Sequence, residues 1–456
     1  MTSTMWRTLR RGSNAARAAL MTAALVGVPA LSPVALGAQA APAPPPRRLL
    51  LGDLYRDVRR ESPRAEAARA LARAARARVP SAKLPPDPEL QLGFMNYTLP
   101  GLEPMDVLGM TQLQLMQMVP VAGKLGLSGR VATAQAAAQA ERARDVEWEL
   151  RSDAAMAFYD VYQTDQRLAV ARETLRLLQD IRKTAEAMYR VGEGRQTDVL
   201  RAQVEVARMV EDTVRMTTMR TGMAARLNVL LDRAADAPVG SPALPAFPDS
   251  VPQLASLVAL AETGRPMVRA GERELKAAEA QATLARREIW PDLTVGVQYG
   301  QRAGEMGTER MGSLMMGATV PVFARSRQLR MREEASAMRQ MAVADVAAMR
   351  ADTRGRVTEA YASLVRARNL TSLYRTTVIP QAEATVTSAL AAYRVGGVDF
   401  MTLLDDRMTV NNYRQELFAL EADQGKAWAD LEMLLGRELF DANNAGGVAA
   451  TAGERR

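Results

Sequence analysis

The sequence contains no cysteine and no histidine among its 456 residues, and aromatic residues make up only 5%. Without cysteine the chain has no disulfide framework, no thiolate metal site and no cysteine nucleophile. Without histidine it lacks the commonest general base and the imidazole ligands of most zinc enzymes. It also shows no glycine-rich phosphate loop and no pair of carboxylates that a pocket would bring together. We therefore expect neither an enzyme nor a bound cofactor.

An excess of positive charge is also largely absent from the body of the chain. The formal net charge is +8, but residues 1–40 contain four arginines and no acidic residue, so the remainder carries +4. This balance gives little support to a basic surface for phosphate backbones. No nucleic-acid partner is expected.

Residues 1–40 are predicted to be a secretory signal peptide. They begin with a positive segment from Arg7 to Arg17, continue with a short apolar run, and end at Ala38-Gln39-Ala40, where small residues suit a cleavage site. No later stretch holds the ~18 uncharged apolar residues of a membrane-spanning helix. The exported chain is expected to begin in a Pro-rich leader at 41–50.

The clearest pattern is that the second half of the chain repeats the first at an offset of about 204 residues. The motif Tyr-Arg-Val-Gly at 189–192 recurs at 393–396, and apolar positions beyond it stay in register. Upstream, Pro-Asp at 86–87 recurs at 291–292, and Val-Pro-Val at 119–121 recurs at 320–322. Each half therefore carries the same ordered set of elements.

The matches predict a first repeat at 51–235, a Pro-rich linker at 236–252 and a second repeat at 253–437. Residues 438–456, rich in Ala, Gly and Asn, are expected to form a flexible C-terminal tail. Each repeat is interpreted as a helix, two short strands, one very long helix, a turn and a further helix. The fold is thus predicted to be mostly helical, with a small β part.

The long helices are predicted at about 124–190 and about 325–393. The first range contains no proline, and the second contains only Pro380, which is expected to bend the lower part of the helix. A helix of this length, roughly 100 Å, cannot bury its apolar side within a compact globule. The pattern therefore predicts a coiled coil or a helical tube.

The strands are predicted at about 88–98, 110–120, 291–300 and 312–322. Apolar and polar residues alternate over about ten residues, which suits a tilted membrane strand as well as an ordinary half-buried strand. Four membrane strands cannot close a barrel, and lipid offers no partner for an open edge. If the strands cross a membrane, further copies of the chain must therefore complete the barrel, and three copies supply twelve strands.

The signal peptide, the doubled plan, the Pro-Asp pairs, Val-Pro-Val-Ala-Gly-Lys at 119–124 and the Tyr-Arg-Val-Gly turns resemble the TolC-like outer-membrane efflux family. The resemblance implies a homotrimer in which a 12-stranded β-barrel continues into an α-helical coiled-coil tunnel. It places the chain in the outer membrane of a Gram-negative bacterium, among outer-membrane lipid, with a large periplasmic portion. It implies a passive exit duct of a tripartite efflux system, with a periplasmic adaptor (membrane fusion) protein and an inner-membrane pump of the RND type as partners.

The resemblance also implies roles for single residues. The acidic ring that closes the tunnel at its periplasmic tip corresponds to Asp405, with Asp406 beside it, whereas a second family aspartate corresponds to Thr402. The same acids also suit a solvated helix face near a first turn. The residues expected to meet the adaptor are Tyr189, Val191, Gly192, Tyr393, Val395 and Gly396. The two glycines equally suit a left-handed backbone at helix ends.

Methionine is abundant, with 26 residues, and it clusters around both pairs of strands. Thioethers are soft ligands for Cu(I), so metal ions such as Cu(I) or Ag(I) are one hypothesis for the cargo. The candidate contacts are Met105, Met110, Met306 and Met311. The alternative is that methionine replaces leucine as an adaptable apolar side chain.

A second functional class is a soluble periplasmic coiled-coil scaffold or adaptor protein. An adaptor would place lipoyl-like and barrel domains around a single helical hairpin, whereas this sequence contains two complete repeats. Recovery from the soluble periplasm would favour the scaffold, and a heat-resistant trimer in the outer membrane would favour the duct.

Overall fold

A computed structural model describes residues 48–105, 109–304 and 307–442, all within one compact unit that spans 46–456. The predicted signal peptide, most of the predicted leader, Met306 and residues 443–456 lie outside the described residues. Among the residues that the structure describes, none of the helices combines the length and the apolar character that a membrane crossing requires.

The same order of elements occurs in both repeats. The first repeat contains α1 (Leu51–Glu61), α2 (Pro63–Ser81), β1 (Glu89–Met95), β4 (Met110–Val119), α3 (Lys124–Arg190) and α4 (Gln196–Leu230). The second contains α5 (Leu254–Gly264), α6 (Pro266–Arg287), β5 (Leu293–Gly304), β6 (Gly307–Ala318), α7 (Gln328–Leu373), α8 (Ile379–Arg394) and α9 (Phe400–Leu435). Both α2 and α6 begin at a proline, where the missing N–H leaves no helical bond unmade.

The second long helix is interrupted near its proline, where the sequence predicts only a bend. A π-helical turn, η2 (Tyr374–Val378), separates α7 from α8, and Pro380 lies in the first turn of α8. Proline has no N–H to donate, and its ring clashes with the carbonyl one turn earlier, so the hydrogen-bond ladder takes up an extra residue there. The corresponding helix α3, which has no proline, runs unbroken for 67 residues.

The strands form one antiparallel sheet in the order β1-β4-β5-β6. Two strands come from each repeat, and the repeats meet where β4 pairs with β5. Within the described residues, the outer edges of β1 and β6 pair with no further strand. The first strand is shorter than predicted because Asn96 adopts a left-handed φ of 55°, and the next residues form a separate hairpin of β2 (Tyr97–Thr98) and β3 (Glu103–Pro104).

The last strand occupies 307–318, five residues earlier at its start than the predicted 312–322. Its end is set by Pro321, which has no N–H for a sheet and leads the chain toward α7. The β5–β6 connection is correspondingly short, since Gly304 pairs with Gly307.

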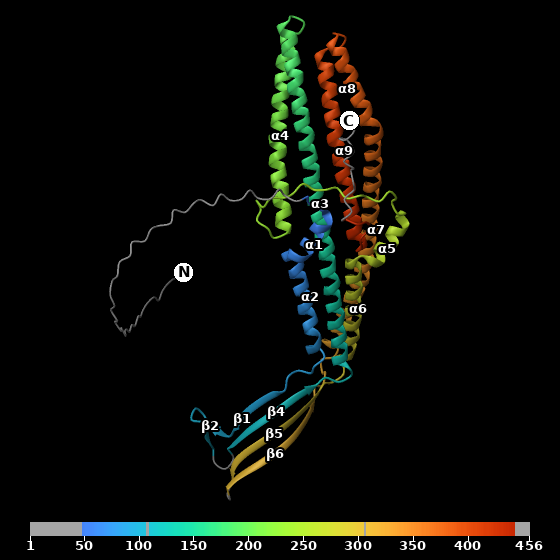
Figure 1. The fold of residues 1–456 in the computed structure, drawn as a ribbon. Helices are drawn as coiled ribbons and strands as arrows, with labels where there is room; N and C mark the ends of the chain where they lie inside the picture. Colours follow the sequence, from blue (N-terminus) through green and yellow to red (C-terminus); the bar gives the residue numbers. More distant parts are fainter. Residues whose placement is uncertain (1–47, 106–108, 305–306, 443–456) are drawn as a thin grey trace, which may run out of the picture. The chain divides into compact units, whose positions relative to one another are not determined.

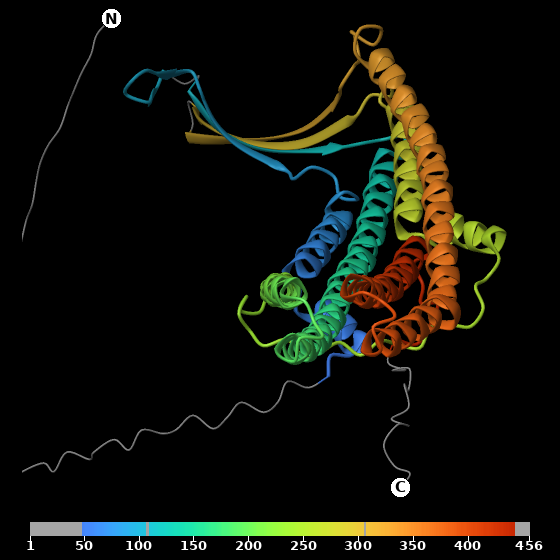
Figure 2. The ribbon, with the colours of Figure 1, turned by 90° about the horizontal axis from the view of Figure 1, so that it is seen from above.

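The helices pack in two sets that share the long helices. Next to the sheet, α2, α3, α6 and α7 pack in that order (Figure 2). Toward the other end, α3 packs against α4 and α9, and α9 packs against α7 and α8 (Figure 1). Because β4 enters α3 at Lys124 and α3 ends at Arg190, the sheet and the helical turns lie at opposite ends of this helix.

The core between these two sets includes segments that were predicted to be loose. Phe440 packs against Trp428 and against Phe247 of the linker, with ring centroids 5.9 and 6.0 Å apart. Residues 438–442 therefore do not belong to a flexible tail: the aromatic ring of Phe440 gives them a place in the core. The leader and the linker also meet, because Leu49 donates a hydrogen bond to the carbonyl of Ser241 at 3.0 Å.

Candidate functional site

The sheet has two chemically different faces. Directly paired residues of antiparallel strands lie on the same face, so the register sorts every strand position. One face, here called the apolar face, carries Leu90, Leu92, Phe94, Leu113, Leu115, Val119, Leu293, Val295, Val297, Tyr299, Leu314 and Met316. These side chains are exposed. From Leu113 to Val119 the apolar band extends about 20 Å along β4.

Polar residues on the apolar face lie mainly at its end remote from the helices. Thr111, Gln301 and Arg310 form one row across β4, β5 and β6. Gln117 lies nearer the helices, where its amide donates to the carbonyl of Pro86 at 2.8 Å. The central band of this face is therefore free of polar side chains, apart from this satisfied amide, among the described strand residues.

The opposite face, here called the polar face, has a different composition. It carries Glu89, Gln91, Gln112, Gln114, Thr294, Gln298, Arg302, Glu309 and Ser313, together with methionines and glycines. Gln298 donates a hydrogen bond to Gln112 across β4 and β5, and Arg302 pairs with Glu309 at 2.7 Å. One face thus suits a hydrocarbon environment and the other suits water.

A buried ion pair joins the two repeats where the sheet meets the helices. The ammonium of Lys124, at the start of α3, donates to Asp292 and to the carbonyl of Trp290, each at 2.9 Å. Glu288 lies 3.6 Å from the same ammonium. Lys124 is 6% exposed, so these partners replace its water. The sequence analysis identified the motif at 119–124 that ends in Lys124 and the Pro-Asp motif that contains Asp292. It did not identify the contact between them.

The turns at the far end of the helices are built around glycine. Gly192 and Gly396 have φ angles of 81° and 74°, in the left-handed region that glycine adopts without strain. Each donates to the carbonyl three residues earlier, from Gly192 to Tyr189 and from Gly396 to Tyr393, at 3.1 Å. Val191 and Val395, beside the glycines, are exposed.

The two tyrosines of the repeated motif differ. Tyr189 is 47% exposed, whereas Tyr393 is 7% exposed and packs against Phe400 with a centroid distance of 5.9 Å. The prediction that Tyr393 forms part of an exposed contact surface is therefore wrong. Its ring fills the core in which α3 and α4 pack against α8 and α9. Burial raises the pKa of the Tyr393 hydroxyl, and the nearby Asp198 raises it further.

Thr402 lies at the beginning of α9, where it belongs to a helix cap. Asp399 is the N-cap residue, and it accepts hydrogen bonds from the backbone N–H of Thr402, at 3.0 Å, and from its hydroxyl. These hydrogen bonds lower the pKa of Asp399, and Arg201 and Arg195 of the other hairpin lower it further. Asp399 was missed at the sequence level, although an Asp directly before an apolar residue such as Phe400 is a typical N-cap pattern.

Asp405 and Asp406 follow in the next turn of α9. Asp405 is exposed and Asp406 is half-buried, and among the described residues neither forms an ion pair within 4 Å. Arg407, the next residue, is half-buried, and burial lowers its pKa, as does the nearby Arg414. Arg414 is itself paired with Glu173 at 3.0 Å and with Glu383 at 2.5 Å. The two unpaired aspartates thus lie between the helical turn at the tip and the ion-paired cluster that Arg414 forms with Glu173 and Glu383.

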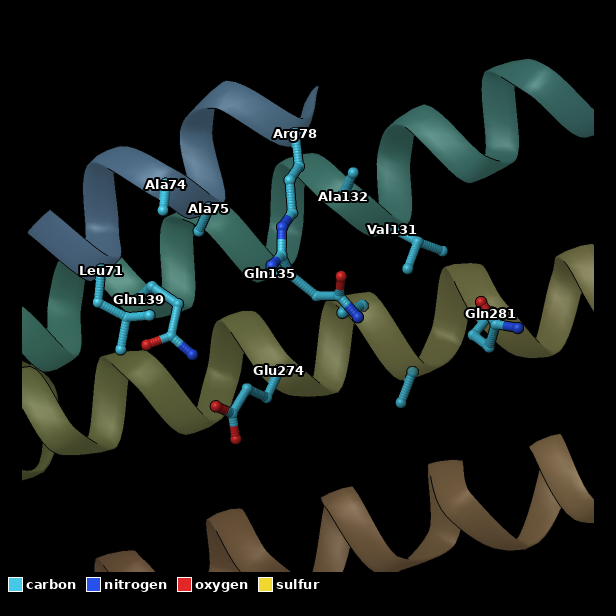
Figure 3. A pocket seen from close by; sticks show the side chains of 12 residues that line it. Leu71, Ala74, Ala75, Arg78, Val131, Ala132, Gln135, Gln139, Glu274 and Gln281 are labelled. Carbon is cyan, nitrogen blue, oxygen red and sulfur yellow. The ribbon is translucent and has the colours of Figure 1, made fainter. Parts of the chain in front are cut away.

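A groove of about 540 Å³ lies between α2, α3 and α6 (Figure 3). Its walls are largely alanine, with the amides of Gln135, Gln139 and Gln281 and the charged groups of Arg78 and Glu274. Small side chains let these helices approach closely and leave the hollow over α3. Within the described part of the chain, the groove brings together no nucleophile with a base and no set of metal-binding carboxylates.

Comparison with known proteins gives a consistent result. The sequence model of the family described as "Outer membrane efflux protein" matches residues 54–232 and 257–437. The pyoverdine export outer membrane protein OpmQ of Pseudomonas putida is 28% identical over 181 residues, which cover 38% of this chain and 37% of that protein. The matched segment thus spans little more than a third of this relative.

Two solved structures share the fold over most of the chain. The outer-membrane channel OprN superposes with a TM-score of 0.73 at 19% identity, covering 85% of this chain and 89% of OprN. The outer membrane protein VceC from Vibrio cholerae superposes with the same score at 18% identity, covering 85% of this chain and 96% of VceC. Both matches therefore show that the chain shares this fold over most of its length.

Proposed function

The chain belongs to the outer membrane efflux protein family, and on that premise we propose that it is a passive outer-membrane exit duct of a tripartite efflux system. It lies in the outer membrane of a Gram-negative bacterium and extends into the periplasm. Its similarity to a pyoverdine export protein supports export as the direction of transport. It needs no catalytic group for this task, because it supplies a water-filled path and the pump supplies the energy.

The observation that carries this proposal is the two-faced sheet with two open edges. β1 and β6 run in opposite directions, since three antiparallel pairings separate them. The β6 edge of one copy can therefore pair with the β1 edge of the next and continue the antiparallel pattern. Three copies give a closed twelve-stranded barrel, which has no edge left in lipid. The apolar face then faces lipid, and the polar face lines the interior.

The helices extend the same path into the periplasm. Each copy contributes four helices at each level, two of them from each repeat, so three copies give a continuous wall. The turns at 191–195 and 395–399 then form the periplasmic end. Val191, Val395 and Tyr189 are the exposed apolar groups that contact a periplasmic adaptor, which links the duct to an inner-membrane pump of the RND type.

Asp405 and Asp406 are proposed to line the periplasmic gate. Three copies of an unpaired aspartate around a narrow axis attract cations and repel anions. Thr402 contributes no second charged ring, because its side chain is a neutral hydroxyl, and this hydroxyl donates a hydrogen bond to the cap residue Asp399.

Single-channel recording of the purified protein in planar bilayers tests the proposal. We expect a heat-resistant trimer that conducts ions with a preference for cations, and Asp405→Asn is expected to lower that preference. Asp249→Asn, which removes an exposed carboxylate from the linker, is the matched control and is expected to leave it unchanged. Recovery of the mature protein as a soluble periplasmic monomer without conductance would contradict the duct and favour a scaffold.

A further inference from the structure

The methionines of the sheet are sorted between its two faces. By register, Met95, Met110, Met116, Met118, Met311 and Met315 all lie on the polar face. Among the described strand residues, Met316 is the only methionine on the apolar face. Leu, Val and Phe show the opposite distribution: every one of them in β1, β4, β5 and β6 lies on the apolar face.

This distribution separates two roles for methionine. If methionine merely replaced leucine as an apolar filler, it would share the face that leucine occupies. Instead it is the only large apolar side chain type among the described residues of the polar face. The property that distinguishes methionine from leucine is its thioether sulfur, which is a soft, neutral metal ligand.

Two of these methionines converge on a glycine near the helical end of the sheet. Met116 and Met315 are the register partners of Gly296 on its two neighbouring strands. A Cβ at Gly296 would lie 3.1 Å from Cγ of Met116 and 3.6 Å from Cε of Met315. Both side chains therefore reach into the space that the missing side chain leaves.

A second group lies toward the other end of the sheet, around Gly300. A Cβ at Gly300 would lie 3.0 Å from Sδ of Met110, and Met311 is the register partner of Gly300 on β6. Met95 pairs directly with Met110 from the other side. Met110 and Met311 thus lie beside one glycine, and Met95 continues the row onto β1. The amides of Gln112 and Gln298 separate this group from the first.

The surroundings of both groups favour a soft ion over a hard one. No group of three or more carboxylates in the described residues could hold a divalent cation, and Arg302 and Glu309 neutralise each other. Amide and thioether ligands carry no charge, so a bound monovalent ion is held without strong electrostatic attraction. Weak, repeated binding sites permit an ion to move along a pore.

We propose that these two methionine groups bind soft monovalent metal ions, of the Cu(I) and Ag(I) class, on the interior wall of the sheet. The proposal rests on the proposed function, which makes the polar face the lining of a duct, and it assigns such ions as a cargo. Of the contacts expected from the sequence, Met110 and Met311 belong to the second group. Met105 lies outside the four strands of the sheet.

Ag(I) binding to the purified full-length protein in detergent micelles tests this directly. Equilibrium dialysis against Ag(I) in chloride-free buffer gives the stoichiometry, and the ¹³C-labelled methyl groups of methionine report which side chains shift. We expect M110L/M116L/M311L/M315L to lose both ions per protomer. The matched control, M316L/M331L/M338L/M341L, removes four exposed methionines outside the polar face and is expected to bind as the unmodified protein does.

Gly300→Ala gives a second variant that keeps every sulfur. Its methyl group would meet only side-chain atoms of Met110, which can move aside, so the sheet is expected to be retained while that group binds Ag(I) more weakly. Equal binding by the quadruple variant and its control would overturn the proposal. Single-channel conductance in potassium salt separates this outcome from failure of the duct, because the leucine variants are expected to conduct normally and a protein that is not a duct would not conduct at all.

Discussion

Lys124 of the first repeat holds Asp292 of the second at 2.9 Å, and this buried ion pair fixes β4 beside β5. Each partner has an equivalent in the other repeat. Aligning the Val-Pro-Val motifs places Arg325 where Lys124 lies, and aligning the Pro-Asp motifs places Asp87 where Asp292 lies. In the described residues, Arg325 and Asp87 are exposed and form no ion pair within 4 Å. They flank the open edges of β6 and β1.

We therefore expect Arg325 of one protomer to pair with Asp87 of the next. Reversing one charge, with Asp87→Arg or Arg325→Asp, is expected to weaken each subunit interface by about 2–5 kcal/mol, because the remaining charge is left buried without a partner. The measurement is the temperature at which the trimer dissociates on a denaturing gel. Val322 and Phe323 support this position, since they are 78% and 75% exposed beside Arg325 and are free to pack in the interface.

The charge swap provides the control for this pairing. Asp87→Arg combined with Arg325→Asp is expected to recover most of the lost stability. Arg327→Asp, two residues further on, is expected to have little effect. If the single reversals leave the trimer as stable as before, Arg325 and Asp87 do not form a counterpart of the Lys124–Asp292 ion pair between protomers.

The two tyrosines of the turn motif should respond differently to truncation. Tyr393→Ala is expected to lower the free energy of unfolding by about 3–5 kcal/mol, because it empties a packed site against Phe400. Tyr189→Ala should change stability by about 0.5 kcal/mol or less, since the side chain is exposed. Thermal unfolding measures both. A co-purified adaptor should bind Tyr189→Ala less tightly, and unchanged binding would remove Tyr189 from the docking surface.

A glycine in α9 allows a buried ring to approach the helix. A Cβ at Gly425 would overlap the ring of Tyr159, which is fully buried and cannot move aside. Gly425→Ala is therefore expected to destabilise the protein by about 1–3 kcal/mol through overpacking. Gly355→Ala on α7 is the control, because a Cβ there meets nothing within 4 Å, and it should stabilise the helix by about 0.5–1 kcal/mol. Equal effects of the two changes would contradict this packing argument.

One buried and one half-buried carboxyl should make stability depend on pH. Burial raises the pKa of Asp145 and of Asp430. A carboxyl whose pKa is higher in the folded state binds more protons there, so its contribution to stability falls as the pH rises from the unfolded pKa, about 3.9, through the folded value. Asp430→Asn should therefore gain stability over the parent protein toward neutral pH. Parallel melting curves of the two proteins from pH 4 to 8 would contradict this.

Much of the architecture could be predicted from the sequence because local patterns determine it. Alternation of apolar and polar residues predicted the strands, and the absence of proline over 124–190 predicted the unbroken helix α3. The internal repeat predicted the same order of elements in both halves. The π-helical turn at Tyr374–Val378 was signalled only by Pro380, which predicts a bend but not a π-helical turn.

Contacts between distant segments could not be predicted in the same way. The identical motif at 189–192 and 393–396 gives one exposed and one buried tyrosine, because only the second turn packs its ring against Phe400. The docking of Phe440 on Trp428 depends on how α9 lies against the linker. Likewise, the sorting of methionines onto one face required the register between β4 and β5, which joins residues far apart in the chain.

The open-edged sheet also has a consequence for how the protein is made. A single copy in water carries a bare hydrocarbon surface and two strands that attract any other strand. Between export and assembly, each newly made chain is therefore prone to aggregation. Either a chaperone must cover these surfaces, or assembly must be fast. Insertion into lipid and association with two sister chains relieve both hazards at once, so biogenesis should proceed as a single concerted event.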